Sequence, residues 1–217
     1  MLVKKIIYLM LMLFLSRLTT AVEVIEVNFA YVGGGNHLSL LGIKQGIDES
    51  NLQGQFLNQR YNLDLVSSNE IDGHDFSKYV AILTPLNSQQ LTKLAKQSPN
   101  TPIFNLADES DELRLSCIPN MLHITPSSKM KSDALKQLQD KKPGSNANPQ
   151  SWHYSFVKFA ARDLNKRFKK NYKQKMNDDS WAGWAAVKMT SDTVARTQIS
   201  NPKEILKYLK NELTFDG

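Results

Sequence analysis

The sequence predicts an α/β protein in which one parallel sheet carries helices on both faces and is followed by a helical C-terminal segment. Between residues 22 and 140, short runs rich in β-branched and aromatic residues alternate with segments whose apolar residues recur at the helical period. After residue 151 only helical patterns remain. Strands that alternate with helices form βα units, and such units build a parallel sheet.

The first unit is expected to be strand, helix, strand. The run VEVIEVNFAY (residues 22–31) predicts a strand, and the glycines of Gly33–Gly35 end it in a loop. In Leu38–Ser50 the apolar residues recur near every 3.6 residues, which predicts a helix. In Arg60–Val66 apolar and polar residues alternate, which is typical of a half-buried strand.

The next unit repeats this order. Tyr79–Leu83 predicts a buried strand, Thr84–Asn87 a loop, and Ser88 is expected to cap a helix that ends at Gln97. The sheet is then completed by two short strands and a helix with an apolar side formed by four residues. The strands are Pro102–Asn105 and Met121–Ile124, and the helix is Ser127–Asp140. The apolar side of this helix consists of Met130, Ala134, Leu135 and Leu138.

The pattern changes at residue 141. Residues 141–151 hold two prolines, a glycine and small polar residues, and predict a linker. Aromatic and aliphatic residues from Trp152 to Tyr172 then recur at helical spacing, which predicts one long amphipathic helix. A second helix is expected to carry Trp181, Trp184, Ala185 and Met189, with Asp178, Asp179 or Ser180 as its cap. A third begins with Asn201 as cap and Pro202 in its first turn, and turns Ile205, Leu206 and Leu209 inward.

The N-terminal residues 1–21 are expected to be a cleavable signal peptide. Lys4 and Lys5 precede a ten-residue apolar run, and small residues end at Ala21, after which we expect cleavage. An uncleaved N-terminal anchor is the alternative. The expected organisation is therefore a signal peptide (1–21), an α/β lobe (22–140), a linker (141–151) and a helical segment (152–217), in an exported, periplasmic protein.

Composition and charge exclude several classes of protein. With 41% hydrophobic residues, 10 glycines and 8 prolines, the chain is neither disordered, nor collagen, nor a protein with many membrane spans. Residues 22–140 have 9 basic and 14 acidic residues, whereas residues 141–217 have 15 basic and 7 acidic ones. Much of this excess lies in Lys166–Lys175, which we interpret as a solvated helix face rather than a phosphate-binding stripe, so no nucleic-acid partner is expected. The single cysteine, Cys117, stands between Leu115 and Ile118 and is expected to be buried and inert.

Two polar loops are the candidate binding site. Thr84–Asn87 and Asn105–Asp111 both follow strands of the predicted parallel sheet and should open at the same edge. Hydroxyls, amides and backbone N–H groups there could bind a small polar solute, although ordinary surface loops are an equal alternative. The triple glycine lacks the G-x-G-x-x-G spacing, the four histidines lack metal-ligand spacing, and no nucleophile has a recognisable base. We therefore expect no catalysis, metal or cofactor.

Three segments resemble a known family. They are GIKQGIDESNLQGQFLNQRYNLDLV (residues 42–66), TPIFNLADESDELRLSCIPNMLHITPSSKMKSDALKQL (residues 101–138), and the tail with WAGWAAVKMTSD and NPKEILKYLKNELTFDG. Together they resemble type I periplasmic solute-binding proteins of the branched-chain amino-acid ABC transporter class. The second segment is most similar to the subgroup associated with pyrroloquinoline-quinone (PQQ)-dependent alcohol dehydrogenase systems.

The resemblance implies two α/β lobes that close around a small solute, which is then delivered to a membrane permease. By position it implies solute contacts from Thr84 and Pro85 in the first loop and from Ala107 and Glu109 in the second. Asn105 and Asp108 of the second loop complete the set of candidate ligand-binding residues. Where amino-acid binders offer small hydroxyl residues, this chain has an acidic pair. A carboxylate would be repelled there, so the pair favours a cationic or neutral solute.

The chain departs from the family in length. The resemblance implies strands of a second lobe between Leu138 and Trp152, where only the linker stands, and final strands that would follow Gly217. The helix that it implies between Val66 and Tyr79 is also expected to be short. We therefore expect a shortened member whose C-terminal helices are a remnant of the second lobe, with weak or lost solute binding. These helices would pack on the first lobe or leave apolar surface for a partner. The function expected is the solute-binding component of a transport system; the alternative is a non-catalytic accessory protein of a periplasmic dehydrogenase, with membrane contact only through a partner.

Overall fold

The computed structural model describes residues 23–158 and 160–214. Its centre is a five-stranded parallel sheet in the order β2-β1-β3-β4-β5. The strands are β1 (Ile25–Val32), β2 (Gln59–Val66), β3 (Ala81–Thr84), β4 (Ile103–Asn105) and β5 (Met121–His123). The predicted α/β class with a parallel sheet is confirmed, and each strand lies within three residues of its expected bounds. The predicted signal peptide lies outside the described residues.

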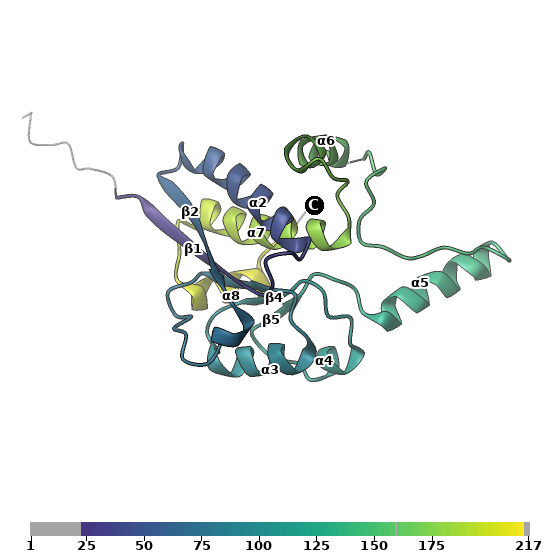
Figure 1. Ribbon diagram of the computed structural model, residues 1–217, viewed down its shortest axis with the longest axis horizontal. Helices are drawn as coiled ribbons and strands as arrows, with labels where there is room; N and C mark the ends of the chain where they lie inside the picture. Colours follow the sequence, from purple (N-terminus) through teal and green to yellow (C-terminus); the bar gives the residue numbers. More distant parts are fainter. Residues whose placement is uncertain (1–22, 159, 215–217) are drawn as a thin grey trace, which may run out of the picture.

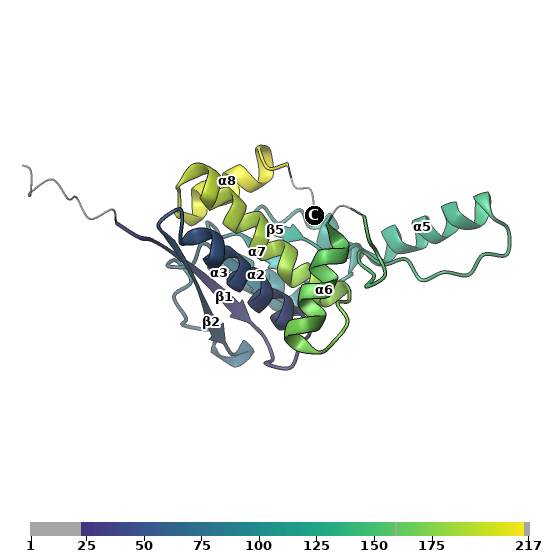
Figure 2. The same ribbon diagram turned by 90° about the horizontal axis from the view of Figure 1, so that it is seen from above.

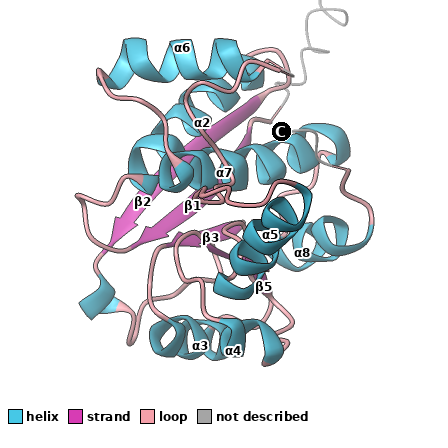
Figure 3. Cartoon of the chain, turned by 90° about the vertical axis from the view of Figure 1, so that its right-hand side faces the viewer, coloured by secondary structure: helices cyan, strands magenta, loops and turns pink. Residues whose placement is uncertain are grey.

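Helices cover both faces of the sheet (Figure 1; Figure 3). One face carries α2 (Ser39–Gly54), α7 (Asp178–Thr197) and α8 (Pro202–Asn211), and the other α3 (Ser88–Gln97) and the short α4 (Asp111–Leu115). Alternation along β1 creates the two cores, because successive side chains of a strand point to opposite faces. Val27, Phe29 and Tyr31 enter the core under α2 and α7, whereas Ala30 and Val32 enter the core over α3.

The C-terminal helices pack on this sheet. α7 lies alongside α2, and α8 packs against α7, so that Val187, Val194 and Ile205 belong to the same core as Phe29 (Figure 2). Of the two arrangements expected for these helices, the structure has the one in which they pack on the first lobe. Only a single turn, η1 (Ser68–Glu70), lies between β2 and β3, as expected.

Two helix caps differ from the prediction by one residue or more. Asn87, not Ser88, caps α3, because its side chain accepts a hydrogen bond from the Gln90 N–H. Asn177, not one of the following three residues, caps α7 and forms a capping box with Ser180. The cap of α8 is Asn201, as predicted.

The long helix expected from residue 152 is wrong in its first half. The helix α6 covers only Ala161–Tyr172, and residues 152–158 form a loop that precedes it. Trp152 is nevertheless 5% exposed, because it packs with Leu164 and Phe168 of α6 in a third, smaller core. The aromatic periodicity thus marked a shared core rather than one continuous helix.

The helix α5 (Ser128–Lys141) does not bury its apolar side. It begins with Ser127 as cap, as the sequence indicates, but none of its residues is buried and Met130 is 57% exposed. Figure 1 shows it projecting from the body, with residues 142–151 returning beside it. A second correction concerns Cys117, which was expected to be buried but is exposed in the turn after α4, where its φ is 49°.

Candidate functional site

The carboxyl ends of the strands meet at one edge of the sheet. Thr84 of β3 pairs with Asn105 of β4, and Asn105 pairs with His123 of β5, so these three polar residues lie side by side at the last positions of neighbouring strands. This edge is where parallel sheets bind ligands. The six predicted contact residues, Thr84, Pro85, Asn105, Ala107, Asp108 and Glu109, all follow or end β3 and β4 here.

Thr84 joins two strand ends. Its side chain is fully buried, and its hydroxyl donates to the Val32 carbonyl at 2.6 Å while accepting from the Leu86 N–H at 3.2 Å. The loop after β1 lies against the loop after β3, since a Cβ on Gly33 would stand 3.0 Å from Pro85 Cδ. Thr84 therefore fixes the position of Pro85 and presents no free hydroxyl of its own.

Asn105 closes the turn after β4. Its Oδ1 accepts from the N–H groups of Ala107 (3.2 Å) and Asp108 (2.9 Å), and its Nδ2 donates to the Asp108 carbonyl at 2.7 Å. Asn105 Nδ2 also lies 3.0 Å from His123 Nδ1. Burial, and next the charge of Arg114, lower the pKa of His123, so the imidazole is neutral at pH 7 and its Nδ1 can accept this bond.

The acidic pair is largely engaged within the chain. Asp108 accepts from the Ser88 hydroxyl at 2.8 Å and from the Ser110 N–H at 2.9 Å. Glu109 forms an ion pair with Lys131 of α5 at 2.6 Å. The negative charge that the sequence placed at this edge is thus partly neutralised, and the ion pair also anchors the first turn of α5 beside the loops.

Arg114 of α4 is the residue that sequence reasoning missed. Its guanidinium donates to the carbonyls of Ser110 (3.1 Å) and Thr125, so it links the loop after β4 to the loop after β5. Burial lowers the pKa of Arg114, although nearby carboxylates oppose the effect. No local pattern marks Lys131 or His123, because each reaches the site from an element that is distant in the sequence. Arg114 lies just beyond the predicted loop, but only the fold brings it to the Thr125 carbonyl.

The edge is polar, and most of its polar side chains are already bonded within the chain. Internally bonded side chains and the Glu109–Lys131 ion pair surround Pro85 and Ala107, which are partly exposed. In the part of the chain that the structure describes, no group of three or more His, Cys, Asp or Glu side chains is placed to hold a metal ion. Such an arrangement can orient a small polar molecule through hydrogen bonds.

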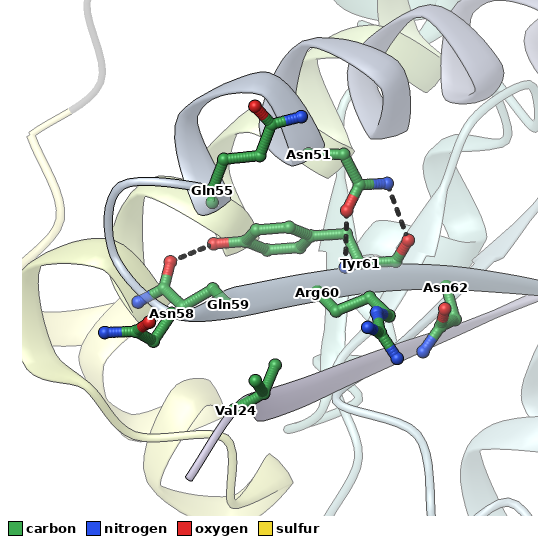
Figure 4. A pocket seen from close by; sticks show the side chains of 9 residues that line it. Val24, Asn51, Gln55, Asn58, Gln59, Arg60, Tyr61 and Asn62 are labelled. Carbon is green, nitrogen blue, oxygen red and sulfur yellow. Dashed lines mark hydrogen bonds between the residues drawn. The ribbon is translucent and has the colours of Figure 1, made fainter. Parts of the chain in front are cut away.

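A cavity of about 510 Å³ lies at the opposite end of the sheet, beside the start of β2 (Figure 4). Strand β1 bonds to β2 through the carbonyls of Asn58 and Val66, which accept from the N–H groups of Ile25 and Gly33. The backbone groups of even-numbered β2 residues therefore point toward β1, and those of odd-numbered residues such as Tyr61 point to the free edge of the sheet. The Asn51 side chain of α2 donates to the Tyr61 carbonyl and accepts from the Tyr61 N–H, at 2.8 Å each. The cavity therefore borders a protected sheet edge, which needs such cover against pairing with another chain.

The fold is that of type I periplasmic binding proteins, as comparison with solved structures shows. A possible leucine/isoleucine/valine-binding protein from Rhodopirellula baltica superposes with a TM-score of 0.70 at 10% identity, covering 91% of this chain and 89% of that one. An ABC transporter substrate-binding protein from Desulfitobacterium hafniense in complex with Leu gives 0.67 at 12% identity, covering 86% and 89%.

The branched-chain amino acid transporter substrate-binding protein LivJ from Streptococcus pneumoniae, in complex with isoleucine, gives 0.64 at 10% identity and covers 90% of each chain. No protein-family model and no curated protein matches the sequence. At these identities the likeness defines the fold.

Proposed function

We propose that this chain is a solute-binding component of an ABC-type transport system and acts in the periplasm after cleavage behind Ala21. The observation that carries the proposal is the juxtaposition of the loops after β3 and β4 at the carboxyl edge of a sheet with the type I binding-protein fold. Two of the structures with this fold hold Leu or isoleucine. The expected partners are a small solute and a membrane permease.

The solute class follows from the charges at the edge. Asp108 is half-buried and keeps its negative charge while its oxygens accept from Ser88 and Ser110, and Glu109 is balanced by Lys131. A free carboxylate of a ligand would meet the oxygens of Asp108, whereas an ammonium or an amide would be attracted to them. We propose a neutral or cationic solute, contacted by Pro85, Ala107, Asp108 and Glu109 above the buried Thr84 and Asn105.

A second function is supported by the topology. In residues 23–158 and 160–214 all strands belong to one sheet, so the described chain has no second sheet to close over the loops. A solute bound on one lobe alone would remain open to water, and its binding would be weak. The resemblance of residues 101–138 then supports an accessory role, without catalysis, in a PQQ-dependent alcohol dehydrogenase system.

Thermal melting of the chain from residue 22 onward tests the first proposal. The panel contains neutral amino acids, amides, polyamines, alcohols and short acids. A solute at a hundred times its Kd stabilises the folded state by about 2.7 kcal/mol. For a chain of this size that raises the Tm by about 5–10 °C.

The matched variants are Asp108→Asn and Glu112→Gln. Both remove one carboxylate near the loops, but only Asp108 lies within the loop after β4, whereas Glu112 is exposed on α4. We expect Asp108→Asn to reduce the shift caused by a cationic or amide solute and Glu112→Gln to retain it. If no solute on the panel moves the Tm, the transport role fails and the accessory role is favoured.

A further inference from the structure

The outer face of α6 is strongly basic. Between residues 158 and 175 the chain has eight basic residues and one carboxylate. The inner face of α6 buries Ala161, Leu164 and Phe168. Burial of this apolar stripe turns the charged residues of α6 toward solvent.

One flank of α6 is occupied by α2. Arg167 forms an ion pair with Glu49 at 2.8 Å, and Asn171 donates to Gln45 at 2.8 Å. The opposite flank begins at Asn165, which donates to the Phe156 carbonyl at 3.2 Å and therefore marks the side on which the 152–158 loop lies.

Helical spacing places four exposed basic residues beyond Asn165 on this loop side: Arg162, Lys166, Lys169 and Lys173. Among the described salt bridges only one involves this group, the 3.6 Å pair of Arg162 with Asp163.

The adjoining loop exposes apolar side chains. Tyr154 is 44%, Phe156 40% and Val157 64% exposed. Lys175 lies over the Tyr154 ring with its Nζ 3.9 Å from the centroid, which ties the loop to the end of α6. A strip thus joins exposed aromatic and aliphatic side chains to a row of four cations, of which only Arg162 has a described carboxylate partner.

We propose that this strip is a docking surface for an anionic phospholipid bilayer. Anionic headgroups attract clustered lysines and arginines, whose stems can lie along the interface while their charges reach the phosphates. Tyr154, Phe156 and Val157 would enter the headgroup region, where aromatic side chains are favoured. A solvated polyanion such as nucleic acid or an acidic protein segment would satisfy the charges but leave Val157 exposed to water.

The mode of contact is peripheral. Along the described parts of the chain, no helix is both long and apolar enough to cross a membrane. The helix α6 instead lies with its apolar face on the protein, so the loop supplies the apolar contact with the bilayer. The sequence led us to expect membrane contact only through a partner; the proposed surface would bring the chain to the bilayer directly and does not depend on solute binding.

Co-sedimentation with vesicles tests this proposal. The chain from residue 22 onward retains every described element. It is mixed with vesicles of phosphatidylcholine alone or of equal parts phosphatidylcholine and phosphatidylglycerol. We expect binding to the anionic vesicles only, and loss of binding at 0.5 M salt, because salt screens surface charge. Each charge removed should weaken partitioning about fivefold, so Lys166→Gln with Lys169→Gln should weaken it about 25-fold.

The control variant carries Lys203→Gln and Lys207→Gln, two exposed lysines of α8. It removes the same net charge from another surface and should bind nearly as the parent does. Val157→Ser should weaken binding at constant charge. The proposal is overturned if anionic vesicles do not bind, if both lysine pairs weaken binding equally, or if Val157→Ser has no effect. Binding to polyglutamate but not to vesicles would assign the surface to an acidic polymer instead.

Discussion

At the scale of single residues, the candidate site is held together by polar groups that bond to the chain itself. Thr84 bonds to the end of β1, Asn105 closes its own turn, and Asp108 joins Ser88 to Ser110. A buried polar group without such partners would destabilise the fold. The same bonds fix the positions of the backbone groups and of the exposed atoms at the edge, so a solute would meet a preorganised surface.

His123 should make stability depend on pH. The pKa of His123 is lowered in the folded state. Below about pH 6.5 His123 is therefore protonated more fully in the unfolded chain than in the folded chain. The unfolded state then binds more protons, and stability falls as the pH is lowered from 7.5 to 5.5. The loss from one group is at most about 1.4 kcal/mol per pH unit. Urea unfolding at pH 7.5, 6.5 and 5.5 measures this slope.

The variant His123→Gln is the comparison, because it keeps a polar side chain without a titrating proton. The other three histidines remain, so the difference between the two slopes isolates His123. Parallel slopes for parent and variant would mean that His123 does not couple folding to protonation.

Only part of this site can be predicted from the sequence. The rule that ligands bind beyond the carboxyl ends of parallel strands indicates Thr84 and Asn105 directly. It does not reveal that Lys131 neutralises Glu109, because that ion pair depends on where α5 starts in space. Cys117 was misplaced for a similar reason, since apolar neighbours suggest burial but the residue lies exposed in a turn with positive φ.

At the scale of elements, the close packing of α2 against α7 organises one face of the sheet. A Cβ on Gly42 would stand 1.7 Å from the Ser180 carbonyl oxygen, and one on Gly183 would stand 2.2 Å from the Ser39 oxygen. Glycine is required at these contacts because each helix backbone lies against the other. Hydrophobic periodicity predicts both helices, but it does not predict that these small residues face each other.

The variant Gly42→Ala should therefore be strongly destabilising. The added methyl group must push α7 away from α2, and overpacking of this kind costs about 3 kcal/mol, which corresponds to a Tm lower by roughly 6–12 °C. Gly35→Ala is the matched control, because its Cβ would meet nothing within 4 Å. Calorimetry on both variants checks the contrast, and equal Tm values would contradict the packing argument.

At the scale of the whole molecule, the N-terminal sheet and the C-terminal helices share one core, and α5 projects from it as an arm (Figure 1). The strands lie in residues 25–123, yet α7 and α8 from the C-terminal segment cover one face of the sheet. The helical periodicity predicts where these helices lie in the sequence. It does not predict whether their apolar faces pack on the first lobe or stay exposed. That choice depends on the surface left open beside α2, which is a property of the folded sheet.

Two deletions distinguish the body from the arm. A chain that ends at residue 151 loses α7 and α8, leaves Ile43 and Tyr61 without cover, and should fail to unfold cooperatively. Replacement of residues 132–149 by a short Gly-Ser linker removes most of α5, in which no residue is buried.

The ends of that deletion lie close together, because Lys131, Ser132 and Pro149 line one surface cavity. The arm deletion should therefore keep the Tm within about 2 °C, since substitution of exposed groups usually changes stability by less than about 0.5 kcal/mol. Thermal melts followed by circular dichroism measure the cooperativity of unfolding and the Tm of both deletion variants. Cooperative unfolding of the chain that ends at residue 151 would show instead that the strands and their first helices form an independent domain.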